Sequence, residues 1–227
     1  MWALTLDGAL GLCPKNCEDA KVKRVLDVGT GTGIWAMEFG SMPVNVQFQV
    51  DDLEEPWIFN QKFDYIHCRD LIGGFGDWPK FFAQSYENLE PGGYVEVQSF
   101  TFPCQSDDGT LLPDHALMQW SDFMMEAAKA LGRCLDIPTV FQALAGEAGF
   151  TNIEAKKFKW AMNSWPKDKK DKLLGAWELE NATTGLEGLC MALFTRGLGW
   201  TKLEVDVFLD RVRADMRNRS IHAYWPM

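Results

Sequence analysis

Short apolar runs alternate with amphipathic stretches along the first hundred residues of the chain. The run at 25–28 ends in glycines, which is typical of a buried parallel strand. Residues 34–39 then predict a helix that stops near Gly40. Residues 44–50 alternate valine or phenylalanine with polar side chains, and this period of two predicts a second strand.

The same alternation continues to residue 100. A strand is expected at 63–68 and a helix at 78–89, and the proline and two glycines at 91–93 break that helix before a strand at 94–100. Strands that alternate with helices favour the α/β class, built on a doubly wound, mostly parallel sheet. Ligands of such sheets bind beyond the carboxyl ends of the strands.

The second half of the chain has a helical pattern. Apolar positions at helical spacing predict a long helix near 117–131 and a shorter one at 139–148. Thr201 followed by Glu204 forms a capping box at the start of a last helix. Residues 150–162 have room for one more strand.

Composition fits one folded domain of 227 residues, since 47% of them are hydrophobic and 13% aromatic. We expect residues 1–100 to form a cofactor-binding half and residues 101–227 a helical cap and C-terminal half of that single domain, 1–227. A net charge of −10 disfavours direct nucleic-acid binding. Local lysine and arginine clusters have acidic neighbours and are typical of solvated faces.

Six scattered cysteines show no spacing for a metal site, so no metal is expected. Reduced, mostly buried thiols would suit a cytoplasmic or nuclear protein. The chain shows neither a signal peptide nor a membrane-spanning run, and no membrane partner is expected.

A glycine-rich turn follows the first strand and opens the first helix. Its candidate cofactor-binding residues are Asp27, Gly29, Thr30, Gly31 and Gly33. Gly31 lets the backbone approach a ligand without a side chain in the way, and the start of the helix offers free N–H groups. A glycine turn alone is a weak signal, because such turns also join strands to helices that bind nothing.

Asp27 gives this turn a chemical preference. A carboxylate at that position would repel the pyrophosphate of a dinucleotide, whereas it would attract a cationic amine such as the amino-acid end of S-adenosylmethionine. The turn therefore favours a methyl donor over a dinucleotide.

Residues 25–35 resemble motif I of the class I S-adenosylmethionine-dependent methyltransferases. Further segments resemble the LaeA-like, TAM-type fungal subgroup of that family: DDLEEPW, FDYIHCRDLIGGFGDWPKFFAQSYENLEPGGYVEVQSF, TRGLGW and NRSIHAYWPM. The resemblance covers nearly the whole chain. It implies a Rossmann-like fold, S-adenosyl-L-methionine as cofactor, a small-molecule or protein methyl acceptor, and regulatory protein partners in secondary metabolism.

The resemblance also implies roles for individual residues. Asp27 and the glycines of the turn would hold the methionine moiety and approach the ribose. The stretch Asp51, Asp52 and Leu53 would face the adenine, through a carboxylate and a backbone N–H. Cys68 and Arg69 would border the methionine end, unless Cys68 is simply a buried core residue and Arg69 a surface ion-pair partner.

Two features depart from the family pattern. The stretch from Gly33 to Asp51 has room for one helix and one strand, so a strand that carries a ribose-binding carboxylate is missing. Either the 44–50 strand keeps the family's third position and leaves a gap, or it moves beside the 25–28 strand, which would bring Asp51 or Asp52 to the ribose. We favour the second arrangement, because a gap leaves backbone groups unpaired.

The second departure is the chain end at Met227, before the last antiparallel strand of the family. We expect both departures to lower stability and cofactor affinity.

No catalytic residue is assigned. His67 lies within a predicted strand and is expected to be structural, His115 is the best candidate for a base, and His222 belongs to the terminal motif. Three aromatic side chains, Trp120, Phe123 and Trp177, would wall an acceptor site or simply fill the core. The competing functions are a methyltransferase-like regulatory or scaffold protein without activity and, less favoured because of Asp27, a nicotinamide-dependent oxidoreductase.

Overall fold

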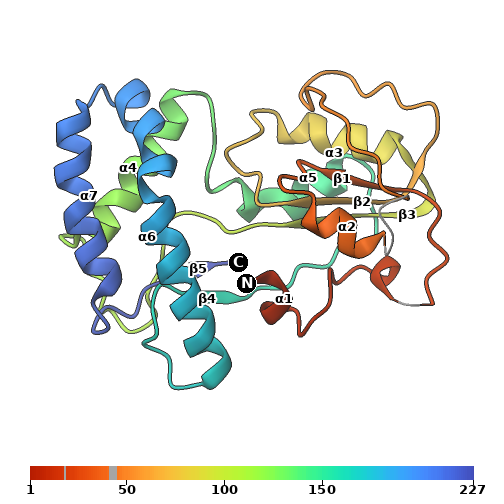
Figure 1. The fold of residues 1–227 in the computed structure, drawn as a ribbon. Helices are drawn as coiled ribbons and strands as arrows, with labels where there is room; N and C mark the ends of the chain where they lie inside the picture. The colour runs from red at the N-terminus through yellow and green to blue at the C-terminus, as the bar shows by residue number, and fades with distance from the viewer. Residues whose placement is uncertain (18, 41–44) are drawn as a thin grey trace.

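The computed structural model describes residues 1–17, 19–40 and 45–227. Figure 1 shows two lobes: one contains a parallel sheet with helices on both faces, and the other is built from three long helices. Both chain termini lie near the centre of the molecule, where the lobes meet.

Three parallel strands form the sheet in the order β1-β2-β3, which confirms the α/β prediction. Their bounds are Val25–Val28 for β1, Phe63–Arg69 for β2 and Leu89–Gln98 for β3. The strand predicted at 94–100 begins earlier, because Leu89 already pairs with Phe63. A register shift lies between Phe63 and Tyr65, so the proline and glycines at 91–93 form an irregularity inside the strand.

The strand predicted at 44–50 is wrong for residues 45–50, which form no strand, and Val44 lies outside the described residues. Among the described strands, β1 pairs only with β2, so neither expected position of this segment in the sheet is formed. The reason is that its apolar side chains share no buried face: Val46 is half-buried, Phe48 is 57% exposed and Val50 is fully exposed. Alternation of apolar and polar residues without a face to bury does not make a strand.

Different elements cover the two faces of the sheet. Helices α3 (Trp78–Glu87) and α5 (Phe141–Glu147) pack on the face that carries Ile66 and Cys68. The other face carries Tyr65 and lies under α2 (Ile34–Phe39) and the N-terminal segment, which contains the short helices α1 (Trp2–Thr5) and η1 (Pro14–Asn16). Side chains at alternate positions of each strand therefore enter different environments.

The second lobe has its own core, formed where three helices meet. Their bounds are Ala116–Ala130 for α4, Lys169–Gly197 for α6 and Lys202–Arg217 for α7. Fully buried side chains fill the space between them: Leu117, Leu186, Cys190, Phe194, Val205, Val212 and Met216. The helices predicted near 117–131 and after Thr201 are thus confirmed, including the capping box at Thr201 and Glu204.

Short elements complete this lobe. The strand expected within 150–162 is β4 (Lys159–Ala161), and it pairs antiparallel with β5 (Tyr224–Pro226). The helix predicted at 139–148 divides into η3 (Ile137–Val140) and α5. None of the helices in the described part of the chain combines the length and the apolar character needed to cross a membrane.

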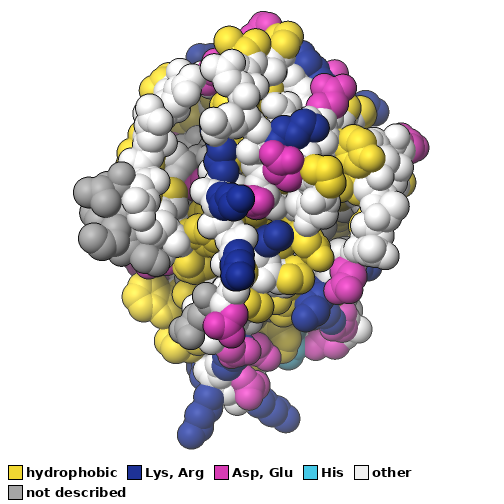
Figure 2. Space-filling view, turned by 90° about the vertical axis from the view of Figure 1, so that its right-hand side faces the viewer, with side chains coloured by type: hydrophobic (Ala, Val, Ile, Leu, Met, Phe, Trp, Pro, Cys, Tyr) yellow, Lys and Arg dark blue, Asp and Glu magenta, His cyan; other side chains and the backbone are white. Residues whose placement is uncertain are grey.

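Figure 2 shows the end of the sheet lobe that faces away from the three long helices. Lysine and arginine side chains form a broken column on this face, with acidic side chains among them and apolar groups beside them. Basic side chains are thus interrupted by acidic ones here, in keeping with the net charge of −10.

Candidate cofactor site

The glycine turn lies at the carboxyl end of β1, and its three glycines have left-handed backbone conformations. Their φ angles are 69° at Gly29, 56° at Gly31 and 78° at Gly33. A Cβ at Gly29 would lie 2.4 Å from Leu71 Cδ1, and one at Gly33 would lie 2.7 Å from the Phe48 ring. At Gly31 the nearest atom would be a backbone oxygen 4.0 Å away. A side chain at either outer position would have to displace Leu71 or Phe48 as well as adopt a left-handed backbone, and of the three glycines only Gly31 has open space for a ligand.

Asp27 precedes this turn and is held within the sheet lobe. Its side chain is only 9% exposed, and its Oδ1 lies 2.7 Å from Nδ1 of His67. Trp35 of α2 stacks on the His67 ring at 3.7 Å between ring centroids. The carboxylate is thus fixed at the start of the turn rather than free in solvent.

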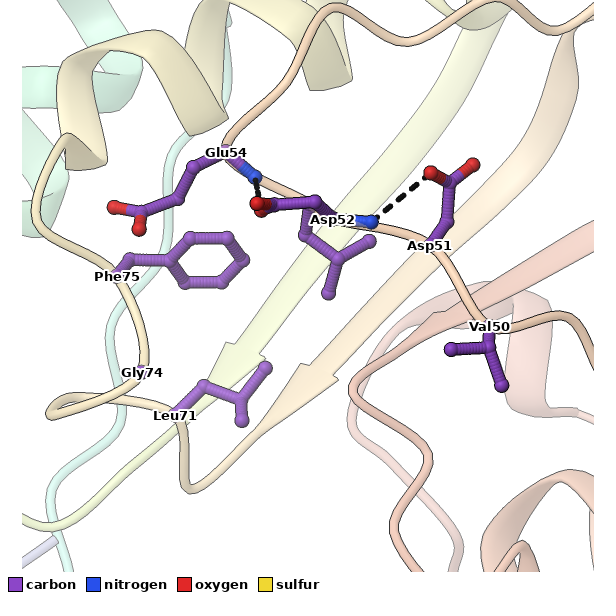
Figure 3. Close-up of a pocket in the computed structure, with 8 residues that line it drawn as sticks. Val50, Asp51, Asp52, Glu54, Leu71, Gly74 and Phe75 are labelled. Carbon is purple, nitrogen blue, oxygen red and sulfur yellow. Dashed lines mark hydrogen bonds between the residues drawn. The ribbon is translucent and has the colours of Figure 1, made fainter.

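A pocket of about 620 Å³ opens beside the turn, within the range of roughly 300–1,000 Å³ that is usual for small-molecule sites. Figure 3 shows Leu71 and Phe75, which project from the loop after β2 toward the segment 50–54. The complete lining is Val50, Asp51, Asp52, Leu53, Glu54, Leu71, Gly74 and Phe75. Because Leu71 contacts both the pocket and Gly29, the pocket and the turn are neighbours.

All three residues expected at the adenine line this pocket. Asp51 and Asp52 are exposed and Leu53 is half-buried. The Asp52 backbone N–H donates to Oδ1 of Asp51 at 2.9 Å, and the Glu54 backbone N–H donates to Oδ1 of Asp52 at 3.0 Å. These bonds give the segment a fixed shape without a strand, so the predicted residues reach the pocket although the predicted strand does not form.

Glu54 is a pocket residue that sequence reasoning missed. Its carboxylate accepts from the Gly76 backbone N–H at 2.6 Å and from two nitrogens of Arg133, at 2.8 and 3.1 Å. These donors lower the pKa of Glu54 to about 2. The Gly76 hydrogen bond fastens the 50–54 segment to the loop after β2, and the ion pair with Arg133 fastens it to the loop after α4. The motif DDLEEPW does not reveal this role of Glu54, because Gly76 and Arg133 lie far from Glu54 in the sequence.

Cys68 and Arg69 are not among the residues that line the pocket. Cys68 is completely buried on the sheet face under α3 and α5, and burial raises the pKa of its thiol. Arg69 donates from Nε to Gln98 Oε1 at 2.6 Å and from Nη2 to the Leu10 carbonyl at 2.8 Å. Their place at the methionine end stays a prediction.

The other candidates belong to the helical lobe. His115 caps the start of α4, and its Nδ1 accepts from the Leu112 backbone N–H at 3.1 Å. Trp120 is buried with its indole N–H 2.8 Å from Cys190 Sγ. Phe123 packs against this lobe's core and Trp177 is 60% exposed, so none of these groups lines the pocket.

Comparison with known proteins identifies the family. Residues 9–155 match the model of the family described as methyltransferase domain. The chain belongs to this methyltransferase family. It is 34% identical to a probable methyltransferase, tdiE, of Emericella nidulans over 100% of this chain and 76% of that protein. It is 36% identical to the methyltransferase pytC of Aspergillus terreus over 90% of this chain and 69% of that protein.

A third relative carries a regulatory name. The secondary metabolism regulator LAE1 of Cochliobolus heterostrophus is 31% identical over 98% of this methyltransferase and 80% of the regulator. The fungal, LaeA-like resemblance is therefore confirmed. S-adenosyl-L-methionine is the cofactor that membership of the family implies.

The residues of the turn fit such a cofactor. Oγ1 of Thr30 is buried and finds no hydrogen-bond partner in the described part of the chain, and Gly31 beside it faces open space. A nearby carboxylate and a pocket with both acidic and apolar walls supply partners for an ammonium group, hydroxyls and a flat ring.

Proposed function

We propose that this methyltransferase binds S-adenosyl-L-methionine at the Asp27–Gly33 turn and the adjacent pocket, and transfers its methyl group to a small secondary metabolite or a protein. The observation that carries the proposal is the open face of Gly31 between a fixed carboxylate and a pocket of about 620 Å³. That arrangement suits a long ligand with a cationic end and a flat end.

Each part of the site has a role in this proposal. Asp27 receives the ammonium group, Gly31 lets the backbone approach the ligand, and the 51–53 stretch binds the adenosine end. When bound, the cofactor would supply a methyl group on a positively charged sulfur, activated for in-line attack on the methyl carbon with the C–S electron pair left on sulfur. The chain itself supplies mainly proximity and orientation.

Calorimetric titration with S-adenosylmethionine and S-adenosylhomocysteine tests the proposal. We expect both to bind the wild-type chain, and Gly31→Val to abolish the heat, because a branched side chain would occupy the open space beside the turn. Gly109→Val is the matched control, since Gly109 also has a positive φ, of 74°, and open space around it. Absence of heat and of any thermal shift at millimolar ligand would rule out the enzyme.

A regulatory or scaffold protein without activity is the second candidate. The lack of a strand at 45–50 favours it, because none of the described strands brings an acidic residue to the outer edge of β1. The same titration separates the two candidates. Regulatory protein partners and a cytoplasmic or nuclear location remain predictions.

The acceptor is tested separately, once binding is established. Incubation with labelled cofactor and fungal extract is expected to label either small molecules or protein, and fractionation by size followed by mass spectrometry distinguishes these acceptors. A chain that binds the cofactor but labels neither fraction would fit the scaffold better.

A further inference from the structure

Asp27 and His67 are partners across the sheet. They lie opposite each other in the β1–β2 register, and Oδ1 of Asp27 is 2.7 Å from Nδ1 of His67. His67 is completely buried, and the Trp35 ring lies parallel to its imidazole within 3°. Register, stacking and burial thus hold this imidazole against the carboxylate.

The surroundings of the second ring nitrogen, Nε2, indicate which nitrogen of His67 carries the proton. Nε2 of His67 is buried and has no hydrogen-bond partner among the described residues. The carboxylate of Glu96, opposite His67 on β3, instead accepts from Tyr65, Gln98 and the N-terminal segment. A buried N–H without an acceptor is costly, so the structure favours the neutral ring with its proton on Nδ1.

A neutral His67 leaves the pair with the single negative charge of Asp27. One carboxylate oxygen is taken by the imidazole, and Oδ2 makes no hydrogen bond with the described residues. A fixed charge with one free oxygen attracts a cation more strongly in a poorly solvated place than in water. A protonated ring would cancel that charge.

We propose that His67 is a positioning residue for the cofactor: its Nδ1–H holds Asp27 so that the free oxygen receives the ammonium group of the amino-acid tail. The inference rests on the proposed function. It differs from a purely structural role, in which the ring would serve only to fill the space beneath Trp35.

Two substitutions separate these roles. His67→Phe keeps a ring for Trp35 and removes the donor, whereas His67→Asn keeps a donor near the Nδ1 position and removes the ring. The ligands are S-adenosylhomocysteine, which has the amino-acid tail, and 5′-methylthioadenosine, which lacks it. Affinities are measured by calorimetry, and folding is checked by thermal unfolding.

We expect His67→Phe to weaken binding of S-adenosylhomocysteine about tenfold or more, the usual effect of losing a hydrogen bond to a charged group. Binding of 5′-methylthioadenosine should stay within about twofold, and His67→Asn should retain most of the affinity for both ligands. If His67→Phe does not fold, His67→Leu is used instead, and we expect it to weaken binding of S-adenosylhomocysteine in the same way.

The inference is wrong if His67→Phe binds S-adenosylhomocysteine as tightly as the wild type, or if both ligands weaken equally. A wild-type chain that binds neither ligand would instead overturn the proposed function, and the inference with it.

Discussion

A single buried acid governs the pH dependence expected of the helical lobe. Glu178 on α6 is 5% exposed, and its Oε1 accepts the indole N–H of Trp225 at 2.8 Å. Burial raises the pKa of Glu178 from 4.5 to about 7. Because the folded state holds this proton more tightly, the associated stability is full below about pH 4.5 and is lost as the pH rises through 7.

Glu178→Gln removes the ionisation and keeps an oxygen for Trp225. We expect this variant to be more stable than the wild type at pH 8, by on the order of 2–3 kcal/mol, and the two to be equal near pH 4.5. Urea unfolding at both pH values measures the difference. Glu180→Gln, at an exposed position on the same helix, is the control. A gain that does not depend on pH would show that Glu178 does not titrate as stated.

Local chemistry made some site residues predictable, and long-range packing decided the others. The positions of Asp27 and Gly31 at the strand–turn–helix junction were predictable because the three elements adjoin in sequence, and their part in the site stays a prediction. The pairing of Asp27 with His67 depends on strand register, which no local pattern shows. The burial of Cys68 likewise depends on distant residues, because it results from the packing of α3 and α5 on one face of the sheet.

At the scale of elements, the start of α7 shows a local signal with a measurable effect. The Glu204 backbone N–H donates to Oγ1 of Thr201 at 3.3 Å, and the Thr201 backbone N–H donates to Oε2 of Glu204 at 2.8 Å. We expect Thr201→Ala to lower the free energy of unfolding by about 1 kcal/mol, measured by urea denaturation. Thr184→Ala, on the exposed middle of α6, removes a threonine without removing a cap and should have little effect. An equal loss in both variants would contradict this role of the cap.

Helices and strands were predictable from the sequence where their apolar residues lie on one face and that face packs against one core. The capping box and the apolar stripes of α4 and α7 satisfy that condition, so those helices were expected. Helix α6 was not, since its 29 residues include several glycines and meet α4, α7, β4 and α1 on different sides. The segment 45–50 is the opposite case, because its alternating pattern is clear but its apolar side chains stay largely exposed.

At the scale of the whole molecule, the N-terminal segment joins the two lobes. In the helical lobe, Thr5 accepts from the Trp160 indole at 2.8 Å and Asp7 pairs with Lys170 at 2.7 Å. In the sheet lobe, the Leu10 carbonyl accepts from the Trp35 indole at 2.9 Å and from Arg69 at 2.8 Å. The segment therefore lies over the sheet face that carries Asp27 and His67, so its attachment bears directly on the proposed site.

Glu96 is the strongest point of that attachment, because its two carboxylate oxygens accept the backbone N–H groups of Leu12 and Cys13, each at 2.8 Å. Glu96→Gln replaces one acceptor with a donor, so one N–H loses its partner, and we expect a loss of about 1.5–3 kcal/mol. Amide hydrogen exchange should quicken at residues 10–16 more than in α4 or α7. Glu90→Gln, at the exposed start of the same strand, is the control. Unchanged protection at 10–16 in Glu96→Gln would mean that the segment's other contacts, with Trp35, Arg69 and the helical lobe, are enough to hold it in place.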